Sequence, residues 1–339
     1  MARPAVAAAA MPSAMHLVMR SISVTTLPAA NWCQSSGLCP RGKGYTEGMR
    51  VLVGIKPGSD VNAVLAWMTA LGFSSPEIEV QTVAEPIAFS SPAYLGAGAT
   101  VPVEVIEAQE SAAKAIAESA RQTLGASAAT IAYGDPASEL LARAQATGVD
   151  LVVAQSEPKS WFNNLFMGSV TRRLAMEGDT SALLIKSAPA DGAHVAVFAS
   201  DLSPYSQKAW QQFGRMQAHG LSKVIAVTVV DTRPVDFGPL LPDPTPFMPN
   251  LPVLDRDALL QRLKEACPAP AGMNVEHVIV DGTPAESLEP YMQSVGADLL
   301  VLGAQGHTWA DRVAIGSVAL HMTMWGSSTL LLVRPPAGS

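Results

Sequence analysis

The stretch GAQGHTWADRVAIGS, residues 303–317, stands between the apolar run ADLLVL (297–302) and a segment with a helical pattern, VALHMTMW (318–325). The apolar run predicts a buried strand. A strand, a loop punctuated by glycines and a glycine-serine pair at a helix start are typical of a phosphate site, because the first N–H groups of a helix have no partner within it. The stretch therefore predicts an α/β unit with an anion site at its strand-to-helix turn.

The same pattern occurs earlier in the chain, which indicates an internal repeat. The segment GVDLVVAQSEP (148–158) aligns without a gap with GADLLVLGAQG (296–306), and SALLIKS (181–187) aligns at the same offset with TLLLVRP (329–335). The N-terminal parts match more loosely, RVLVGIKPGSDVNAVLAWM against VAVFASDLSPYSQKAWQQF. The chain therefore contains two copies of one unit, joined near SAPADGAH (187–194).

Each copy alternates apolar strands with helical segments. In the second copy we expect strands near 195–200, 224–230, 275–280, 298–302 and 329–334. These runs lack strict polar alternation, which is typical of parallel strands covered on both faces. We predict two tandem doubly wound α/β domains with about five parallel strands each, residues 49–188 and 192–336. The end strands, ALLIKS and TLLLVRP, are candidates for pairing between the domains, which would make one chain a pseudo-dimer.

Residues 1–48 differ from the rest of the chain: they hold one acidic residue against four basic ones and are rich in alanine and serine. A transit peptide has this composition, and so does a disordered arm or the product of an upstream start codon. We expect the folded protein to begin at Met49. It would be cytoplasmic, or organellar if the leader is a targeting segment.

Composition excludes several classes of protein. The 339 residues are 48% hydrophobic and 15% charged, with a net charge of −7 and three cysteines. We expect no membrane span, because no apolar stretch is long enough, and no nucleic-acid partner, because no basic block occurs. So few cysteines indicate a reducing compartment, and solitary Cys267 is interpreted as a packed or exposed thiol rather than a nucleophile.

The ligand of a doubly wound sheet binds at the carboxyl ends of the strands, where the strand order reverses. Gly303 follows a strand end, where a side chain would keep a phosphate from the backbone, and Gly306 permits a positive φ. The helix start at Gly316-Ser317 would face the anion. Asp201 ends another strand and either accepts hydrogen bonds from a ribose diol or, like Ser203, caps a helix.

With these motifs the tandem resembles the universal stress protein family, whose ATP-binding members carry G-x2-G-x9-G-[S/T] after the fourth strand. The resemblance covers both repeats and implies a fold of the adenine nucleotide alpha-hydrolase type. It also implies a stress-response regulatory protein that binds ATP, with Mg²⁺. By that resemblance Asp201 would bind ribose and the backbone of Val229 would read adenine. The phosphates would be surrounded by Leu302, Gly303, Gly306, Gly316, Ser317 and Val318.

The first repeat departs from this pattern. Gln155 stands for Gly303, Pro158 for Gly306 and Lys56 for Asp201, and only Gly168 and Ser169 are kept. Proline removes an amide and fixes φ, and glutamine fills the space that a phosphate would need. We therefore predict one competent nucleotide site per chain and a degenerate one in the first repeat.

Several functions remain open at this stage. The leading hypothesis is a nucleotide sensor that acts on an unidentified protein partner, with at most slow ATP hydrolysis and a possible homodimer. The runner-up is a protein-interaction module with a vestigial site, whose recognition lies in the proline-rich segment 234–252. An adenylating enzyme is disfavoured because the chain lacks an SGG loop after the first strand. His307 is interpreted as a loop residue, and no catalytic triad or metal cluster is found.

Overall fold

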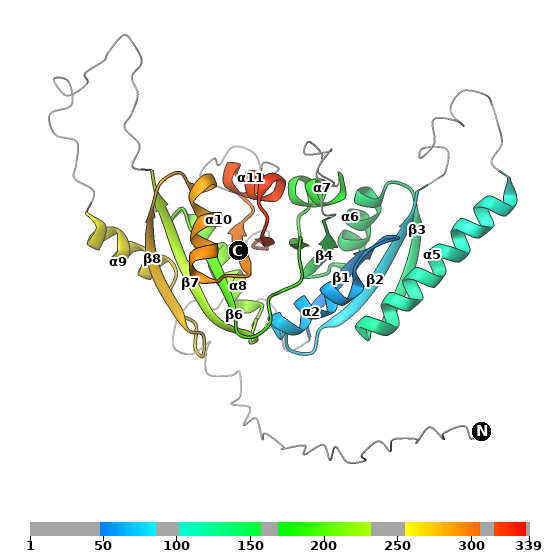
Figure 1. The fold of residues 1–339 in the computed structure, drawn as a ribbon, viewed down its shortest axis with the longest axis horizontal. Coiled ribbons are helices and arrows are strands. Elements are labelled where there is room, and N and C mark those ends of the chain that lie inside the picture. Colours follow the sequence, from blue (N-terminus) through cyan, green and yellow to red (C-terminus); the bar gives the residue numbers. More distant parts are fainter. Residues whose placement is uncertain (1–47, 86–101, 157–168, 232–254, 306–314, 337–339) are drawn as a thin grey trace, which may run out of the picture. The chain divides into compact units, whose positions relative to one another are not determined.

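The computed structural model describes residues 48–85, 102–156, 169–231, 255–305 and 315–336 (Figure 1). Lys43–Ser339 form one compact unit, which contains both repeats. The proposed leader, apart from Gly48, lies outside the described residues, and so does the proline-rich segment 234–252. Pro158, Gly168, Gly306 and His307 also lie outside them.

Both repeats alternate strands and helices as predicted. The first contains β1 (Arg50–Ile55), α2 (Val61–Leu71), β2 (Glu77–Ala84), α5 (Val103–Leu124), β3 (Ala128–Tyr133), α6 (Pro136–Thr147), β4 (Leu151–Gln155), α7 (Ser169–Glu177) and β5 (Ser181–Ile185). The second contains β6 (His194–Ala199), α8 (Pro204–Arg215), β7 (Leu221–Val230), α9 (Arg256–Ala266), β8 (Val275–Asp281), α10 (Pro284–Val295), β9 (Leu299–Gly303), α11 (Ser317–Trp325) and β10 (Thr329–Val333).

The two predicted sheets join into a single sheet of ten strands, in the order β3-β2-β1-β4-β5-β10-β9-β6-β7-β8. Within each repeat every neighbouring pair is parallel. The repeats meet through β5 and β10, which pair antiparallel with Leu183 opposite Leu331. The predicted pairing of the two end strands is therefore confirmed, and the same strand order runs outward from the junction in both directions.

Apolar side chains on both faces of the sheet form the core. All five residues of β5 and all five of β10 are buried, so the junction lies at the centre of the hydrophobic interior. On one face a single cluster runs under both repeats and includes Trp67, Phe198 and Phe213. On the other face there are two clusters: one lies beneath α6 and α7, and the other lies beneath α10 and α11 and also takes in Ala175, Ala182 and Leu184 of the first repeat. Burial on this scale stabilises by ~25 cal/mol per Å² of apolar surface.

Four helices carry a side-chain cap at their start, whereas α5, α10 and α11 do not. Asp60, Asp135, Ser203 and Asp255 accept first-turn N–H groups of α2, α6, α8 and α9. Helix α11 begins after Gly316, which has extended backbone angles and supplies no side-chain cap. Its first-turn N–H groups therefore point away from the helix without that kind of partner.

Candidate functional site

The strands that lead to Asp201 and Gly303 end at the same edge of the sheet. Strands β6 and β9 are neighbours, with Ala199 opposite Leu302, and the strand order reverses between them. Asp201 comes two residues after β6, and Gly303 is the last residue of β9. The point at which doubly wound sheets take their ligands is thus flanked by these two residues.

Backbone hydrogen bonds hold the start of α11 against this edge. Gly316 N donates to Ala304 O at 2.8 Å, and Ala304 N donates to Val333 O of β10 at 3.1 Å. Both ends of the glycine loop are therefore fixed. The Ser317 side chain is exposed, whereas Leu302 is buried and Val318 packs against the core. At Leu302 and Val318 only the backbone is placed to face a ligand.

Asp201 lies in a tight turn between β6 and α8. Its Oδ1 accepts a hydrogen bond from Ser203 N at 3.0 Å, and Ser203 Oγ accepts one from Ser206 N at 3.1 Å. The N-cap is therefore Ser203, while Asp201 is exposed and braces the turn. Between them Leu202 has a φ of 60°, a left-handed conformation that costs a non-glycine residue free energy. Such outliers gather at functional sites.

Val229 lies where β7 extends past its neighbour. The pairing of β7 with β6 ends at Val227, but its pairing with β8 continues to Val230. On the β6 side, the backbone of β7 at Val229 has no neighbouring strand, so its polar groups face the crevice edge. This is the arrangement that backbone recognition of a base requires.

Gly303 has a packing role that the sequence analysis did not anticipate. A β-carbon at this position would lie 3.1 Å from Tyr205 Cε1 and 3.3 Å from Ala209 Cβ. The space beside Gly303 is therefore filled by α8. Burial raises the pKa of Tyr205, and Arg334 and the N–H of Gln305 oppose that shift. Tyr205 thus places its phenol at the beginning of the glycine loop.

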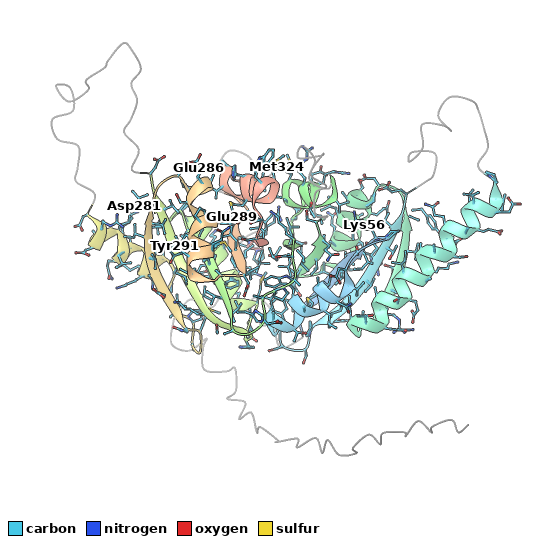
Figure 2. The ribbon with its side chains drawn as sticks, viewed as in Figure 1. Lys56, Asp281, Glu286, Glu289, Tyr291 and Met324 are labelled. Carbon is cyan, nitrogen blue, oxygen red and sulfur yellow. The ribbon has the colours of Figure 1, made fainter. Side chains whose placement is uncertain are left out.

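The first repeat has a different contact at the matching place. Gln155, in the place of Gly303, accepts a hydrogen bond from Asp60 N at 2.7 Å and donates one to Asp60 O at 3.1 Å. Its side chain thereby ties the end of β4 to the start of α2. Lys56, in the place of Asp201, is half-buried (Figure 2).

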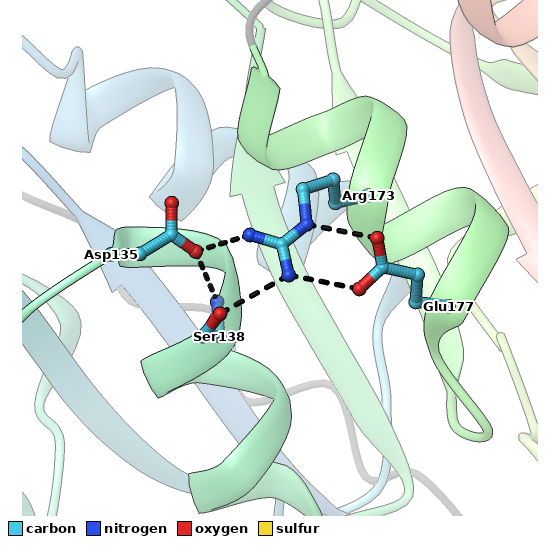
Figure 3. A network of polar contacts seen from close by, with 4 residues as sticks. All are labelled: Asp135, Ser138, Arg173 and Glu177. Carbon is cyan, nitrogen blue, oxygen red and sulfur yellow. Dashed lines mark hydrogen bonds and ion pairs between the residues drawn. The ribbon is translucent and has the colours of Figure 1, made fainter.

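A charged network joins two helices of the first repeat (Figure 3). Arg173 of α7 pairs with Asp135, the cap of α6, and donates to Glu177 at 2.9 Å and to Ser138 Oγ at 3.1 Å. The hydrogen bond from Ser138 N is the largest cause that lowers the pKa of Asp135, and Arg173 adds to it. At the position matching Arg173 the second repeat has His321, so α11 is not fastened in this way.

The second repeat uses a carboxylate of α10 instead. Glu289 accepts hydrogen bonds from the N–H and hydroxyl groups of Ser327 and Ser328, which follow α11. Burial opposes ionisation of Glu289, but these four donors together lower its pKa below the ordinary value. Tyr205, Arg173 and Glu289 were all missed from the sequence, because their partners are distant in the chain.

Metal and thiol chemistry find no support among the described residues. They contain no group of three His, Cys, Asp or Glu side chains that could hold a metal ion. Cys267 is buried, and burial raises the pKa of its thiol to about 12. A thiol with such a pKa is inert at neutral pH, in agreement with its interpretation as a packed residue. None of the helices in the described ranges is long and apolar enough to cross a membrane.

The chain belongs to the universal stress protein family. The sequence profile of that family matches residues 49–186 and 194–327, one segment in each repeat. The predicted family and tandem arrangement are therefore confirmed. No curated protein matches the chain.

Solved structures support the same fold. A universal stress protein from Archaeoglobus fulgidus DSM 4304 is 16% identical, with a TM-score of 0.59 over 86% of this chain and 97% of its own. One described as a putative universal stress protein, from Pseudomonas aeruginosa UCBPP-PA14, is 16% identical with a TM-score of 0.55, over 85% and 94% of the two chains. A universal stress protein in complex with cAMP covers 42% of this chain and 98% of its own at 25% identity, with a TM-score of 0.30, too low to bear on the ligand here.

Proposed function

We propose that the second repeat binds ATP at the carboxyl ends of β6 and β9, and that this occupancy controls the contact of the protein with a partner protein. The observation that carries the proposal is the start of α11. This helix begins at the edge where ligands bind, follows the motif G-x2-G-x9-G-S and has no side-chain cap. A phosphate group would accept hydrogen bonds from the first N–H groups of this helix.

The proposed contacts divide according to the parts of the nucleotide. The backbone of Val229 reads adenine, and the exposed carboxylate of Asp201 accepts hydrogen bonds from the ribose hydroxyls. The phosphates lie against the N–H groups of the loop and helix start, at Leu302, Gly303, Gly306, Gly316, Ser317 and Val318. Of these residues Gly306 lies outside the described part of the chain.

Mg²⁺ fits this proposal as a companion of the phosphates. It prefers oxygen ligands, keeps several waters and is usually held by one or two carboxylates together with phosphate oxygens. The crevice offers Asp201 as a carboxylate on its edge. The chain's own residues would then bind and orient the nucleotide, and we propose a sensor with at most slow hydrolysis rather than an enzyme with turnover.

A cytoplasmic location forms part of the same proposal. The described part of the chain has one cysteine, and that thiol is buried and free. A fold that places its free thiol in the core is suited to a reducing compartment.

One observation favours a second candidate, a protein-interaction module with a vestigial site. Tyr205 fills the space beside Gly303, so the phosphate pocket is narrower at that glycine than the motif alone implies. In this alternative Gly303 is kept for packing α8, and recognition belongs to other surfaces of the chain.

A charge substitution at Ser317 separates the two candidates. Glutamate is favourable at a helix start, because it complements the macrodipole by ~0.3–1 kcal/mol, but it repels a phosphate. In Ser317→Glu we expect unchanged folding and at least about a tenfold loss of ATP affinity, equal to ~1.4 kcal/mol. Ser169→Glu is the matched control in the first repeat and should bind ATP as the wild type does. Equal affinity in wild type and Ser317→Glu would refute the ATP site.

A further inference from the structure

Strands β5 and β10, which join the repeats, are each followed by a cation at the matching position. Lys186 follows β5 in the first repeat, and Arg334 follows β10 in the second. Lys186 Nζ donates a hydrogen bond to Met322 O at 2.7 Å and another to Gly326 O. Met322 belongs to α11, and Gly326 is its C-cap. The lysine of the first repeat therefore binds the carboxyl end of a helix in the second.

Arg334 makes the reciprocal contact. Its guanidinium donates to Thr180 O at 3.0 Å, to Ala175 O and, at 3.5 Å, to Leu174 O. Leu174 and Ala175 belong to α7, and Thr180 lies between that helix and β5. The arginine of the second repeat therefore binds the carboxyl end of a helix in the first.

The backbone N–H groups of Lys186 and Arg334 also bind the opposite repeat. Lys186 N donates to Thr329 Oγ1 at 3.2 Å, and Arg334 N donates to Ser181 Oγ at 3.0 Å. Thr329 and Ser181 are buried first residues of β10 and β5. Each cation is thus anchored by the strand of the opposite repeat before its side chain reaches the helix.

Both helices are the ones that begin at the glycine-serine pair of the repeated sequence pattern. Helix α7 follows Gly168, and α11 follows Gly316. They lie side by side across the junction (Figure 1). Each has nine residues, and a helix of that length is a rigid rod of about 13 Å. A cation at its carboxyl end satisfies the last carbonyls and complements the macrodipole, so it also fixes the opposite end, where the phosphate would bind.

We infer that Lys186 and Arg334 are reciprocal positioning residues, through which each repeat holds the corresponding helix of the other, α11 or α7, in place. A residue of the first repeat therefore helps to fix the geometry of the proposed ATP site in the second. This second step of the inference rests on the proposed function. The side chain of Lys186 binds the carboxyl end of α11, and through that rigid helix it determines where the N–H groups at the other end stand. A displacement of β5 or of the linker after it would therefore alter the affinity for the nucleotide.

The first test measures amide hydrogen exchange in α7 and α11 of the full chain, without any ligand. In Lys186→Met we expect exchange of the α11 amides to rise at least about tenfold, with little change in α7, and in Arg334→Met the reverse. Lys186→Arg should restore the protection of α11. Lys264→Met and Arg262→Met, exposed positions on α9, are the matched controls. Equal exchange of both helices in both variants would overturn the inference, whereas the crossed pattern supports it.

The second test measures affinity for ATP and distinguishes failure of the inference from failure of the proposed function. If the wild type binds ATP, Lys186→Met should weaken it by at least about fivefold, and Lys264→Met should not. Equal affinities in wild type and Lys186→Met would overturn the control of the site by the first repeat. A crossed exchange pattern in a protein that binds no ATP would refute the proposed function and leave the positioning of the helices supported. If Lys186→Met does not fold, Lys186→Gln provides the same comparison.

Discussion

The two repeats share one strand order but differ in the contacts at the ends of β4 and β9. In the first, Gln155 at the end of β4 reaches across to the backbone of Asp60 at the start of α2. In the second, the strand ends in Gly303, and Tyr205 at the start of α8 reaches back over it. The first contact ties strand to helix by hydrogen bonds, whereas the second is a packing contact of an aromatic ring. The two copies thus keep the same strand order while the residues at these strand ends differ.

Substitutions at matched core positions should lower the free energy of unfolding by similar amounts in the two repeats. This loss is the largest effect that we predict. Leu183 and Leu331 face each other across β5 and β10 and are fully buried. Leu183→Ala and Leu331→Ala should each lower the free energy of unfolding by ~2–5 kcal/mol, because each leaves a cavity at the junction. Denaturant unfolding measures both losses. A difference between them of more than ~1.5 kcal/mol would contradict this similarity.

Substitution of Gly303 should reveal the packing that distinguishes the second repeat. In Gly303→Val the new side chain meets Tyr205 and Ala209, and overpacking of this kind costs ~1–3 kcal/mol. The loss should shrink in the double variant with Tyr205→Ala, which removes the ring. Thermal unfolding of the single and double variants gives the coupling free energy. Additive effects would mean that Tyr205 does not limit the space at Gly303.

The first repeat offers the converse substitution. Gln155→Gly removes both hydrogen bonds to Asp60 and should cost ~1–2 kcal/mol, because each is worth ~0.5–1.5 kcal/mol. Gln155→Ala separates that loss from the backbone effect of glycine. Urea unfolding is the measurement. No loss in either variant would mean that the glutamine bridge does not stabilise the first repeat.

The smallest predicted effect concerns pH and Glu289, whose counterpart in the first repeat is Leu141. The pKa of Glu289 is lowered in the folded state, so its stabilisation is present above the unfolded pKa of ~4.3 and is lost as pH falls through the folded value. Glu289→Gln should cost ~1 kcal/mol at pH 7, and the gap to the wild type should close in acid. Urea unfolding at a series of pH values checks this, and a gap independent of pH would contradict it.

The strands and their arrangement could be predicted from the sequence because they depend on residues that are close together in the chain. Apolar runs specified the strands of the second repeat to within a few residues, and the matched end strands predicted the junction of β5 with β10. Ser203 was recognised as a candidate cap from its place before a helix. Each of these features depends on neighbouring residues or on a repeat that can be aligned.

The unpredicted features depend on contacts between distant segments. Nothing near Tyr205 indicates that its ring will lie on Gly303, and nothing near Arg173 indicates that it will pair with Asp135. From the sequence, Gly303 was interpreted as leaving room for a phosphate, and in the structure a side chain there would also press on Tyr205 and Ala209 of α8. Packing partners of this kind become visible only once the helices are placed on the sheet.

The central claim is that the second repeat alone is competent for a nucleotide. Isothermal titration of ATP with Mg²⁺ into the full chain, first shown to be free of copurified nucleotide, tests it directly. We predict one ATP bound per chain. Two per chain would show that Gln155 and Lys56 do not disable the first crevice, and none would show that the uncapped start of α11 is not a phosphate site.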